Sequence, residues 1–346
     1  MDFFERYAEA LLAFSRFSKT LGNRADYVQG GGGNTSMKLD ERLMAVKASG
    51  FLLRDITPDK AYAVLDFEAL RSFYGQHQAG DFPDTEAAGS AAAREAVVAI
   101  EGLAPLRPSV EAGFHALLDR FVAHTHSVYA NLAACCRETE AVLEEALKGA
   151  DYRFAVVPYV NPGATLTFTI RDILEEKGRP QVLVMQNHGV IVHHEEEARC
   201  LAIHEDMNKR LAAFFGLAEG AFPTVRVKAE GAGFVSDTPW LKERLRGTAY
   251  PDGMLLEAPL YPDQMVFFQG TLGESAVIDR ATGLAHYQLP EHTALTLEET
   301  LCAVTFITQT IREKGYTLQT MGEAARQFIG SWESEKYRKQ LAEGKQ

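Results

Sequence analysis

The sequence contains 346 residues, more than a single compact domain usually holds, so its length predicts two domains or one domain with a large extension. Hydrophobic residues make up 46% and charged residues 24% of the chain, which is typical of a folded globular protein and excludes a disordered or fibrous one. The net charge of −12 opposes binding to nucleic acid or to an anionic membrane surface. We find neither an apolar run as long as a membrane span nor a signal peptide, and therefore expect a cytoplasmic protein.

The first third of the chain predicts a helix followed by antiparallel strands. Apolar residues recur at helical spacing over residues 2–21. A glycine-rich loop at residues 29–36 leads into a hairpin whose second strand ends at Lys47, and a third strand is expected over residues 62–66. The polar stretch 75–87 contains glycine, aspartate and proline and is expected to be a surface loop.

The central part of the chain predicts two helix starts on either side of a strand. Ser109 is expected to be the N-cap of a helix with Glu111 in its first turn, because serine caps well and the helix dipole favours a carboxylate there. This helix leads into a strand at residues 121–126, after which Ser127 is expected to cap the next helix.

A second buried strand is predicted by the continuous apolar run at residues 180–185. The turn sequence Asn187-His188-Gly189 breaks this run before another strand begins. A long amphipathic helix is expected over residues 195–215, with His193 and His194 exposed to solvent just before it.

The pattern changes near residue 220 to short segments rich in proline, glycine and aromatic residues, followed by helices expected over 297–314 and 322–329. We therefore predict a first domain at 1–220 and a carboxy-terminal α+β extension at 221–346. The cysteines form no CxxC motif and lie in apolar helical patterns, so we expect buried reduced thiols. They are Cys135, Cys136, Cys200 and Cys302.

Histidines suggest a metal site in this sequence. His124 and His126 are two residues apart on a predicted strand, so their side chains share one face. His188 can join them if the two strands are neighbours, and Glu111 would be a fourth ligand or an acid/base group. Three protein ligands with an open position are typical of a catalytic metal site. An isolated pair of histidines is equally consistent with packed structural side chains. His115 lies four residues after Glu111 and could orient it, although a packed histidine explains it as well.

The glycine run predicts a second functional feature. Four successive glycines are unfavourable inside a strand or helix, so they suggest a close approach of the backbone to another group, with a flexible turn as the alternative. Asn34, Thr35 and Ser36 add short donors, and Lys47 with the turn Ser49-Gly50 adds more, which favours an oxyanion such as phosphate. The run lacks the endings of nucleotide-binding loops, so nucleotide binding is not expected.

Five short motifs occur in the order found in the class II aldolase/adducin family, which the sequence resembles over about residues 5–217. They are Gly32-Gly33-Asn34-Thr35-Ser36, Lys47-Ala48-Ser49-Gly50, Pro108-Ser109-Val110-Glu111, His124-Thr125-His126 and Asn187-His188-Gly189. In character the sequence is most similar to the aldolase part of bifunctional rhamnulose-phosphate aldolase/alcohol dehydrogenases. Those proteins also have a multiple-glycine loop and an extension that looks like the segment from Ser331 to Tyr337.

The resemblance implies an α/β fold, a three-layer α/β/α sandwich with a central mostly antiparallel sheet, and a homotetramer. It implies Zn²⁺, or another divalent metal such as Mn²⁺ or Co²⁺, held by His124, His126 and His188, with Glu111 as a further ligand and the catalytic carboxylate. Lys47 matches a lysine of the epimerase branch. Family members have two hydroxyl residues before the carboxylate, whereas this chain has Ser109-Val110 and lacks one phosphate donor. The residues at phosphate-binding positions are Gly33, Asn34, Ser49, Gly50 and Ser109.

The implied activity is reversible cleavage of a ketose 1-phosphate, of the rhamnulose- or fuculose-phosphate type, to dihydroxyacetone phosphate and an aldehyde. The metal would stabilise the enediolate and Glu111 would move its proton. A second acid, often from a neighbouring subunit, would protonate the aldehyde oxygen, and Tyr159 and Tyr250 are candidates. Epimerisation, dehydration or decarboxylation of a sugar or sugar-acid phosphate on the same site is the alternative. A non-catalytic scaffold of the adducin type is disfavoured because all three histidines are present.

Overall fold

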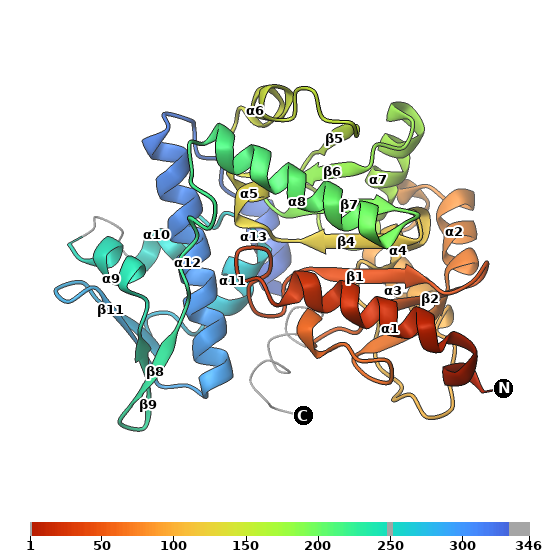
Figure 1. Cartoon of the computed structure of the whole chain (residues 1–346), viewed down its shortest axis with the longest axis horizontal. Helices are drawn as coiled ribbons and strands as arrows, with labels where there is room; N and C mark the ends of the chain where they lie inside the picture. Colours follow the sequence, from red (N-terminus) through yellow and green to blue (C-terminus); the bar gives the residue numbers. More distant parts are fainter. Residues whose placement is uncertain (1, 248–251, 332–346) are drawn as a thin grey trace.

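A seven-stranded sheet forms the centre of the protein, as described by a computed structural model for residues 2–247 and 252–331 (Figure 1). The strand order is β3-β2-β1-β4-β7-β6-β5, and all pairs in this sheet are antiparallel except β5 with β6. The predicted mostly antiparallel sheet is therefore confirmed. Its strands are β1 (Asn34–Lys38), β2 (Leu43–Lys47), β3 (Tyr62–Asp66), β4 (Phe121–Thr125), β5 (Phe154–Val157), β6 (Val182–Met185) and β7 (Gly189–His194).

Helices cover both faces of this sheet, because alternate side chains of its buried strands point to opposite sides. In β7, Val190 and Val192 join one buried apolar cluster, whereas Ile191 joins the other. In Figure 1, α1 and α8 cross in front of the strands. The first cluster includes α1 (Phe3–Gly22), α5 (Val128–Ala134), α6 (Thr139–Ala146) and α8 (Glu197–Phe214). The second includes α2 (Phe67–Gln76), α3 (Thr85–Glu95), α4 (Ala112–Leu117) and α7 (Ala164–Lys177).

The carboxy-terminal part builds a second, four-stranded sheet and several helices, as the change of pattern near residue 220 predicts. Figure 1 shows α12 between this small sheet and the central one. Phe306 of α12 packs edge-on against Tyr129 of α5, so one buried cluster continues across the predicted boundary. The elements are β8 (Val227–Glu230), β9 (Gly233–Ser236), β10 (Ala276–Asp279), β11 (Leu284–Tyr287), α9 (Pro239–Leu245), α10 (Asp252–Glu257), α11 (Pro262–Phe268), α12 (Glu291–Glu313) and α13 (Glu323–Ser331).

Several local predictions are confirmed, and others are wrong. The Ser127 hydroxyl accepts a hydrogen bond from the Ala130 amide and caps α5. The four cysteines are buried and form no disulfide. The stretch 75–87 is not a plain surface loop, because Asp84 caps α3 by accepting from the Ala87 amide. The segment from Trp332 to Tyr337 lies outside the described residues. Among helices within the described ranges, none is long and apolar enough to cross a membrane.

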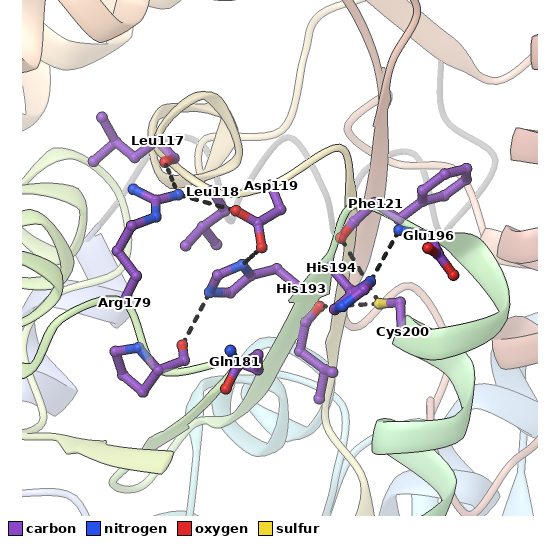
Figure 2. A network of polar contacts seen from close by, with 12 residues as sticks. Leu117, Leu118, Asp119, Phe121, Arg179, Gln181, His193, His194, Glu196 and Cys200 are labelled. Carbon is purple, nitrogen blue, oxygen red and sulfur yellow. Dashed lines mark hydrogen bonds and ion pairs between the residues drawn. The ribbon is translucent and has the colours of Figure 1, made fainter. Parts of the chain in front are cut away.

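His193 is buried, so its predicted exposure to solvent is wrong. Its Nδ1 lies 2.8 Å from Oδ2 of Asp119, and its Nε2 donates to the carbonyl of Pro180 at 3.0 Å. Figure 2 shows the other carboxylate oxygen of Asp119 facing Arg179, at 3.1 Å. This network ties the turn between α4 and β4 to the start of β6.

Candidate active site

Three histidines converge at the end of two neighbouring strands. His124 and His126 come from the end of β4, and His188 comes from the turn between β6 and β7, where Asn187 has a φ of 51°. Because β4 pairs with β7, with His124 opposite Ile191, this turn is brought beside the pair. One ligand atom from each histidine lies within 4.8 Å of the others, and all three side chains are buried.

Two of these rings direct their Nε2 atoms at each other. Nδ1 of His124 lies 3.1 Å from the carbonyl oxygen of Val190, which can only accept, so this Nδ1 is the donor. Nδ1 of His126 faces the carboxylate of Asp263 and donates in the same way. The Nε2 atoms of both rings are 3.2 Å apart. Burial lowers the pKa of His124 to about 4 and that of His188 to about 3, so these rings are neutral at pH 7.

Glu111 adds two more acceptors to this cluster. One carboxylate oxygen lies 3.4 Å from Nε2 of His124, and the other lies 3.4 Å from Nε2 of His188. Burial alone would raise the pKa of Glu111, but His124, His188 and a 2.6 Å hydrogen bond from the Asn34 amide lower it to about 2. The buried Oε1 accepts no hydrogen bond from the described residues.

The donor set fits a divalent metal ion. Lone pairs on neutral imidazoles and an ionised carboxylate repel one another at these distances unless a cation lies between them. Imidazole nitrogen with carboxylate oxygen is a usual ligand set for zinc and related divalent ions. Glu111, His124, His126 and His188 are therefore the residues that can hold such an ion.

The helix start at Ser109 differs from the prediction. The helix α4 begins at Ala112, and Glu111 is its N-cap position without a capping hydrogen bond from its side chain. The Ser109 hydroxyl accepts from the Glu111 amide at 3.3 Å. The Glu111 carboxylate instead turns to the histidines, and it accepts a hydrogen bond from the Asn34 amide.

His115 acts on Glu111 through Asn34 rather than directly. The Asn34 amide nitrogen donates to Glu111, so its oxygen faces Nε2 of His115, which must donate. Nδ1 of His115 then accepts from the Ser36 hydroxyl at 2.7 Å. Burial lowers the pKa of His115 well below its usual value, which keeps this ring neutral. The arrangement fixes which end of the Asn34 amide points at Glu111.

A cavity opens beside the histidines, and most of the predicted phosphate-binding residues line it. Thr35 is the exception: its hydroxyl lies 2.7 Å from that of Ser18 in α1, on the opposite face of β1 from Asn34. The Thr35 side chain thus faces away from the cavity, because side chains alternate along the strand. The cavity is lined by Gly31, Gly33, Asn34, Lys47, Ser49, Gly50, Ser109, Val110, Glu111, His126, Pro162, His188 and Pro262.

Lys47 joins two backbone segments beside this cavity. Its ammonium group donates to the carbonyl of Gly31 at 3.0 Å and to that of Phe51 at 2.8 Å. Lys47 is buried and lines the cavity. It therefore places a positive charge next to the glycine loop and the Ser49-Gly50 turn.

The glycine loop packs tightly against the metal-ligand strand. Gly33 has a φ of +65°, and a Cβ there would lie 2.6 Å from the carbonyl oxygen of His124. At Gly30 the amide donates to the buried carboxylate of Glu299 in α12 at 2.8 Å. The loop is thus held closely from two sides rather than being a freely flexible turn.

Sequence reasoning missed the residues that the extension supplies. Asp263 contacts His126, and Pro262 lines the cavity. The only local signal is a helix start, since Pro262 is the first residue of α11. Tyr159, one of the two predicted acids, is not among the described residues that line the cavity. Tyr250, the other predicted acid, lies outside the described residues.

Residues 14–212 match the family described as Class II Aldolase and Adducin N-terminal domain. The chain belongs to this family. The N-terminal class II aldolase domain of a Thermoplasma acidophilum protein has a TM-score of 0.50 at 22% identity, covering 59% of this chain and 92% of that one. A structure of L-fuculose 1-phosphate aldolase is 20% identical with a TM-score of 0.41, covering 60% of this chain and 85% of that one.

The class II aldolase domain also has a relative among curated proteins, the uncharacterized oxidoreductase YuxG of Bacillus subtilis. The two are 30% identical over 194 residues, which is 53% of this chain and 26% of that protein. The chain thus spans about a quarter of the length of this relative. Class II aldolases are generally dependent on a divalent metal, bind sugar phosphates and are often oligomers. Asp263 and Glu299 lie outside the matched residues.

Proposed function

We propose that the protein is a metal-dependent aldolase that reversibly cleaves a ketose 1-phosphate to dihydroxyacetone phosphate and an aldehyde. One observation carries the proposal: Glu111, His126 and His188 line a cavity that is also lined by anion donors, and His124 lies beside them in the same histidine cluster. A deoxy-ketose of the rhamnulose- or fuculose-phosphate type is the proposed substrate. We further propose a cytoplasmic homotetramer that uses Zn²⁺, with Mn²⁺ or Co²⁺ as alternatives.

The metal site would activate the sugar carbonyl. His124, His126 and His188 would hold the ion, with Glu111 as a further ligand. When bound, a divalent ion supplies Lewis acidity, which stabilises the negative charge left on the substrate when the carbon–carbon bond breaks.

Glu111 is the proposed proton carrier. Asn34 holds one of its oxygens, whereas Oε1 accepts no hydrogen bond from the described residues and can take a proton from carbon or return it. Its low pKa keeps it ionised, so it is able to accept a proton. The acid that protonates the departing aldehyde would come from outside this set, as a neighbouring subunit often provides it in the family.

The other groups that line the cavity would bind the phosphate. Backbone amides of the glycine loop and of the Ser49-Gly50 turn, with the Asn34 and Ser109 side chains, offer several donors to an oxyanion. Lys47 adds a positive charge. Val110 follows Ser109 where the family has a second hydroxyl, so this site would hold phosphate with one donor fewer.

A second reaction class on the same site is epimerisation, dehydration or decarboxylation of a sugar or sugar-acid phosphate. The presence of Lys47 in the cavity favours this alternative, because the epimerase branch has a lysine there. A non-catalytic scaffold is disfavoured, since all four groups that could hold a metal face one another.

Product analysis separates these reactions. The zinc-loaded protein is incubated with dihydroxyacetone phosphate and a panel of aldehydes, and any ketose phosphate is identified by mass spectrometry and NMR. We expect one short hydroxyaldehyde to give product much faster than the others. If no aldehyde reacts while a sugar phosphate is epimerised or dehydrated, the aldolase proposal is wrong and the alternative takes its place.

Replacing a ligand tests the metal dependence. The variant His124→Ala should retain no stoichiometric zinc and should lose cleavage by at least about 1,000-fold, because the Lewis acid and its position are lost. His77→Ala, at a partly exposed histidine outside the cavity, is the control and should keep both. Full activity of wild-type protein after chelation and removal of metal would contradict the mechanism.

A further inference from the structure

We propose that Asp263 of the carboxy-terminal extension is a positioning residue that fixes His126 as a metal ligand. The inference rests on the metal site of the proposed function but not on which sugar reaction it performs. It assigns to the extension a direct part in building the site.

Asp263 is placed so that its carboxylate can act on His126. It lies in the first turn of α11, is fully buried, and its Oδ2 accepts a hydrogen bond from Nδ1 of His126. With the proton on Nδ1, the lone pair of Nε2 points towards His124 and the cavity. The ring of Tyr261, the residue before α11, also packs edge-on against His126, with 6.0 Å between centroids. The His126 ring is therefore fixed both in its tautomer and in its orientation.

The two ligands from β4 are supported differently. His124 donates to the neutral carbonyl of Val190, which belongs to the same sheet. His126 instead donates to a carboxylate from another part of the chain. A carboxylate behind a ligating imidazole raises the basicity of its other nitrogen more than a carbonyl does, and loss of such a partner weakens metal binding. Of the two, His126 is thus the ligand whose strength depends on the extension.

The segment that carries Asp263 is anchored beside the third ligand as well. The side chain of Asn187, next to His188, donates to the carbonyl of Leu260 at 2.9 Å. The amide of Leu260 in turn donates to Gln264 at 2.8 Å, within α11. One short segment of the extension therefore contacts both His126 and the turn that presents His188.

A purely structural role for Asp263 makes a different prediction. An acidic residue in the first turn of a helix stabilises that helix through its dipole, and a buried carboxylate needs a partner. Such a role would change the unfolding free energy only. A positioning role changes the affinity for metal in protein that remains folded.

The test measures zinc binding alone, with full-length protein and no sugar. Wild type and Asp263→Asn are titrated with Zn²⁺ in competition with a chromophoric chelator, and thermal unfolding of the metal-free proteins checks their folding. We expect a loss of zinc affinity of about 10- to 100-fold in Asp263→Asn. The visible spectrum of the Co²⁺-loaded variant should also change, since it reports ligand geometry.

Glu298→Gln is the matched control. Glu298 is another fully buried carboxylate of the extension, but its partners are Ser236 and Tyr287 of the small sheet. This variant should bind zinc as wild type does, whatever its stability. A folded Asp263→Asn protein with wild-type zinc affinity and cobalt spectrum overturns the inference.

The outcome is separate from that of the proposed function. If wild-type protein binds zinc and the variant binds it more weakly, the inference stands even when no aldehyde reacts. If wild-type protein binds no divalent metal, both proposals fall together. If zinc affinity is unchanged while sugar cleavage is present, only the inference falls.

Discussion

Gly32 illustrates how one residue permits the contact between two distant segments. A Cβ atom at this position would lie 2.3 Å from Oδ2 of Asp263 and 2.8 Å from Nδ1 of His126. At Gly31, in contrast, a Cβ would meet no atom within 4 Å. The two neighbouring glycines therefore differ in their roles. Of the two, only Gly32 must lack a side chain for the Asp263 carboxylate to reach His126.

The variant Gly32→Ala should separate Asp263 from His126. We expect zinc affinity to fall by at least about tenfold and the unfolding free energy to fall by about 1–3 kcal/mol, as for other overpacked sites. Chelator competition and urea unfolding measure the two quantities. Gly31→Ala is the control for both. Equal zinc affinities of the two variants would show that the close approach at Gly32 does not matter for the ligand.

The short helix α4 is the element that links the site to the rest of the fold. Its amino-terminal end presents Glu111, and the side chains of a lysine and two arginines bind the carbonyls at its other end. Lys38 donates to the carbonyl of Asp119 at 2.8 Å, and Arg71 and Arg179 donate to those of the last two residues of α4 at 3.1 Å. Cations at a helix carboxy terminus are favourable, so these contacts hold the helix in register.

Asp119 should make this arrangement sensitive to acid. Burial alone would raise its pKa, but the contacts with His193 and Arg179 outweigh burial and lower the pKa of this carboxyl well below its usual range. The stabilisation is therefore present above the unfolded pKa, about 4, and is lost as the pH falls towards the folded one. We expect Asp119→Asn to lose about 1–3 kcal/mol of unfolding free energy at pH 7 and less near pH 3.

Urea unfolding between pH 7 and pH 3 measures this difference for Asp119→Asn. The control is Asp172→Asn, whose exposed carboxylate pairs with Arg171 and whose loss should cost at most about 1 kcal/mol. A loss in Asp119→Asn that is the same at both pH values would mean that the network does not depend on its charge.

At the scale of the whole molecule, the extension holds the glycine loop as well as the metal ligands. Glu299 of α12 accepts from the Gly30 amide, and a Cβ at Gly30 would clash with Thr296 one turn earlier. The two parts of the chain therefore share contacts on both sides of the site. Removal of the extension would take away groups that the first 220 residues cannot replace.

Glu299→Gln should show the cost of burying a charge at this junction. Burial raises the pKa of Glu299 above its usual 4.5, so its contribution to stability is complete below that pH and is lost as the pH rises through the folded pKa. Glutamine keeps an acceptor for the Gly30 amide and does not titrate. The unfolding free energy of the variant should therefore rise relative to wild type between pH 5 and pH 8.

Thermal or urea unfolding at the two pH values provides the comparison for Glu299→Gln. Glu291→Gln, at the exposed start of the same helix, is the control and should change stability by no more than about 0.5 kcal/mol. A relative stability of Glu299→Gln that falls with increasing pH would contradict the expected sign.

The sequence by itself determined the features that depend on neighbouring residues. The spacing of His124 and His126 puts both rings on one side of the sheet, and Ser127 caps α5, because strand alternation and capping are local. The apolar run before Asn187 predicts the buried strand β6 and the turn that carries His188. The order of these motifs was sufficient to identify the family.

The tertiary structure alone decided which distant groups meet. Asp263 lies 137 positions from His126, and Glu299 lies 269 positions from Gly30, so no local spacing could pair them. The pairing of β1 with its neighbours directs the Thr35 side chain away from the cavity. His193 is buried, where it contacts Asp119. The charge balance around each buried polar group depends on the segments packed against it, and local sequence patterns do not encode that packing.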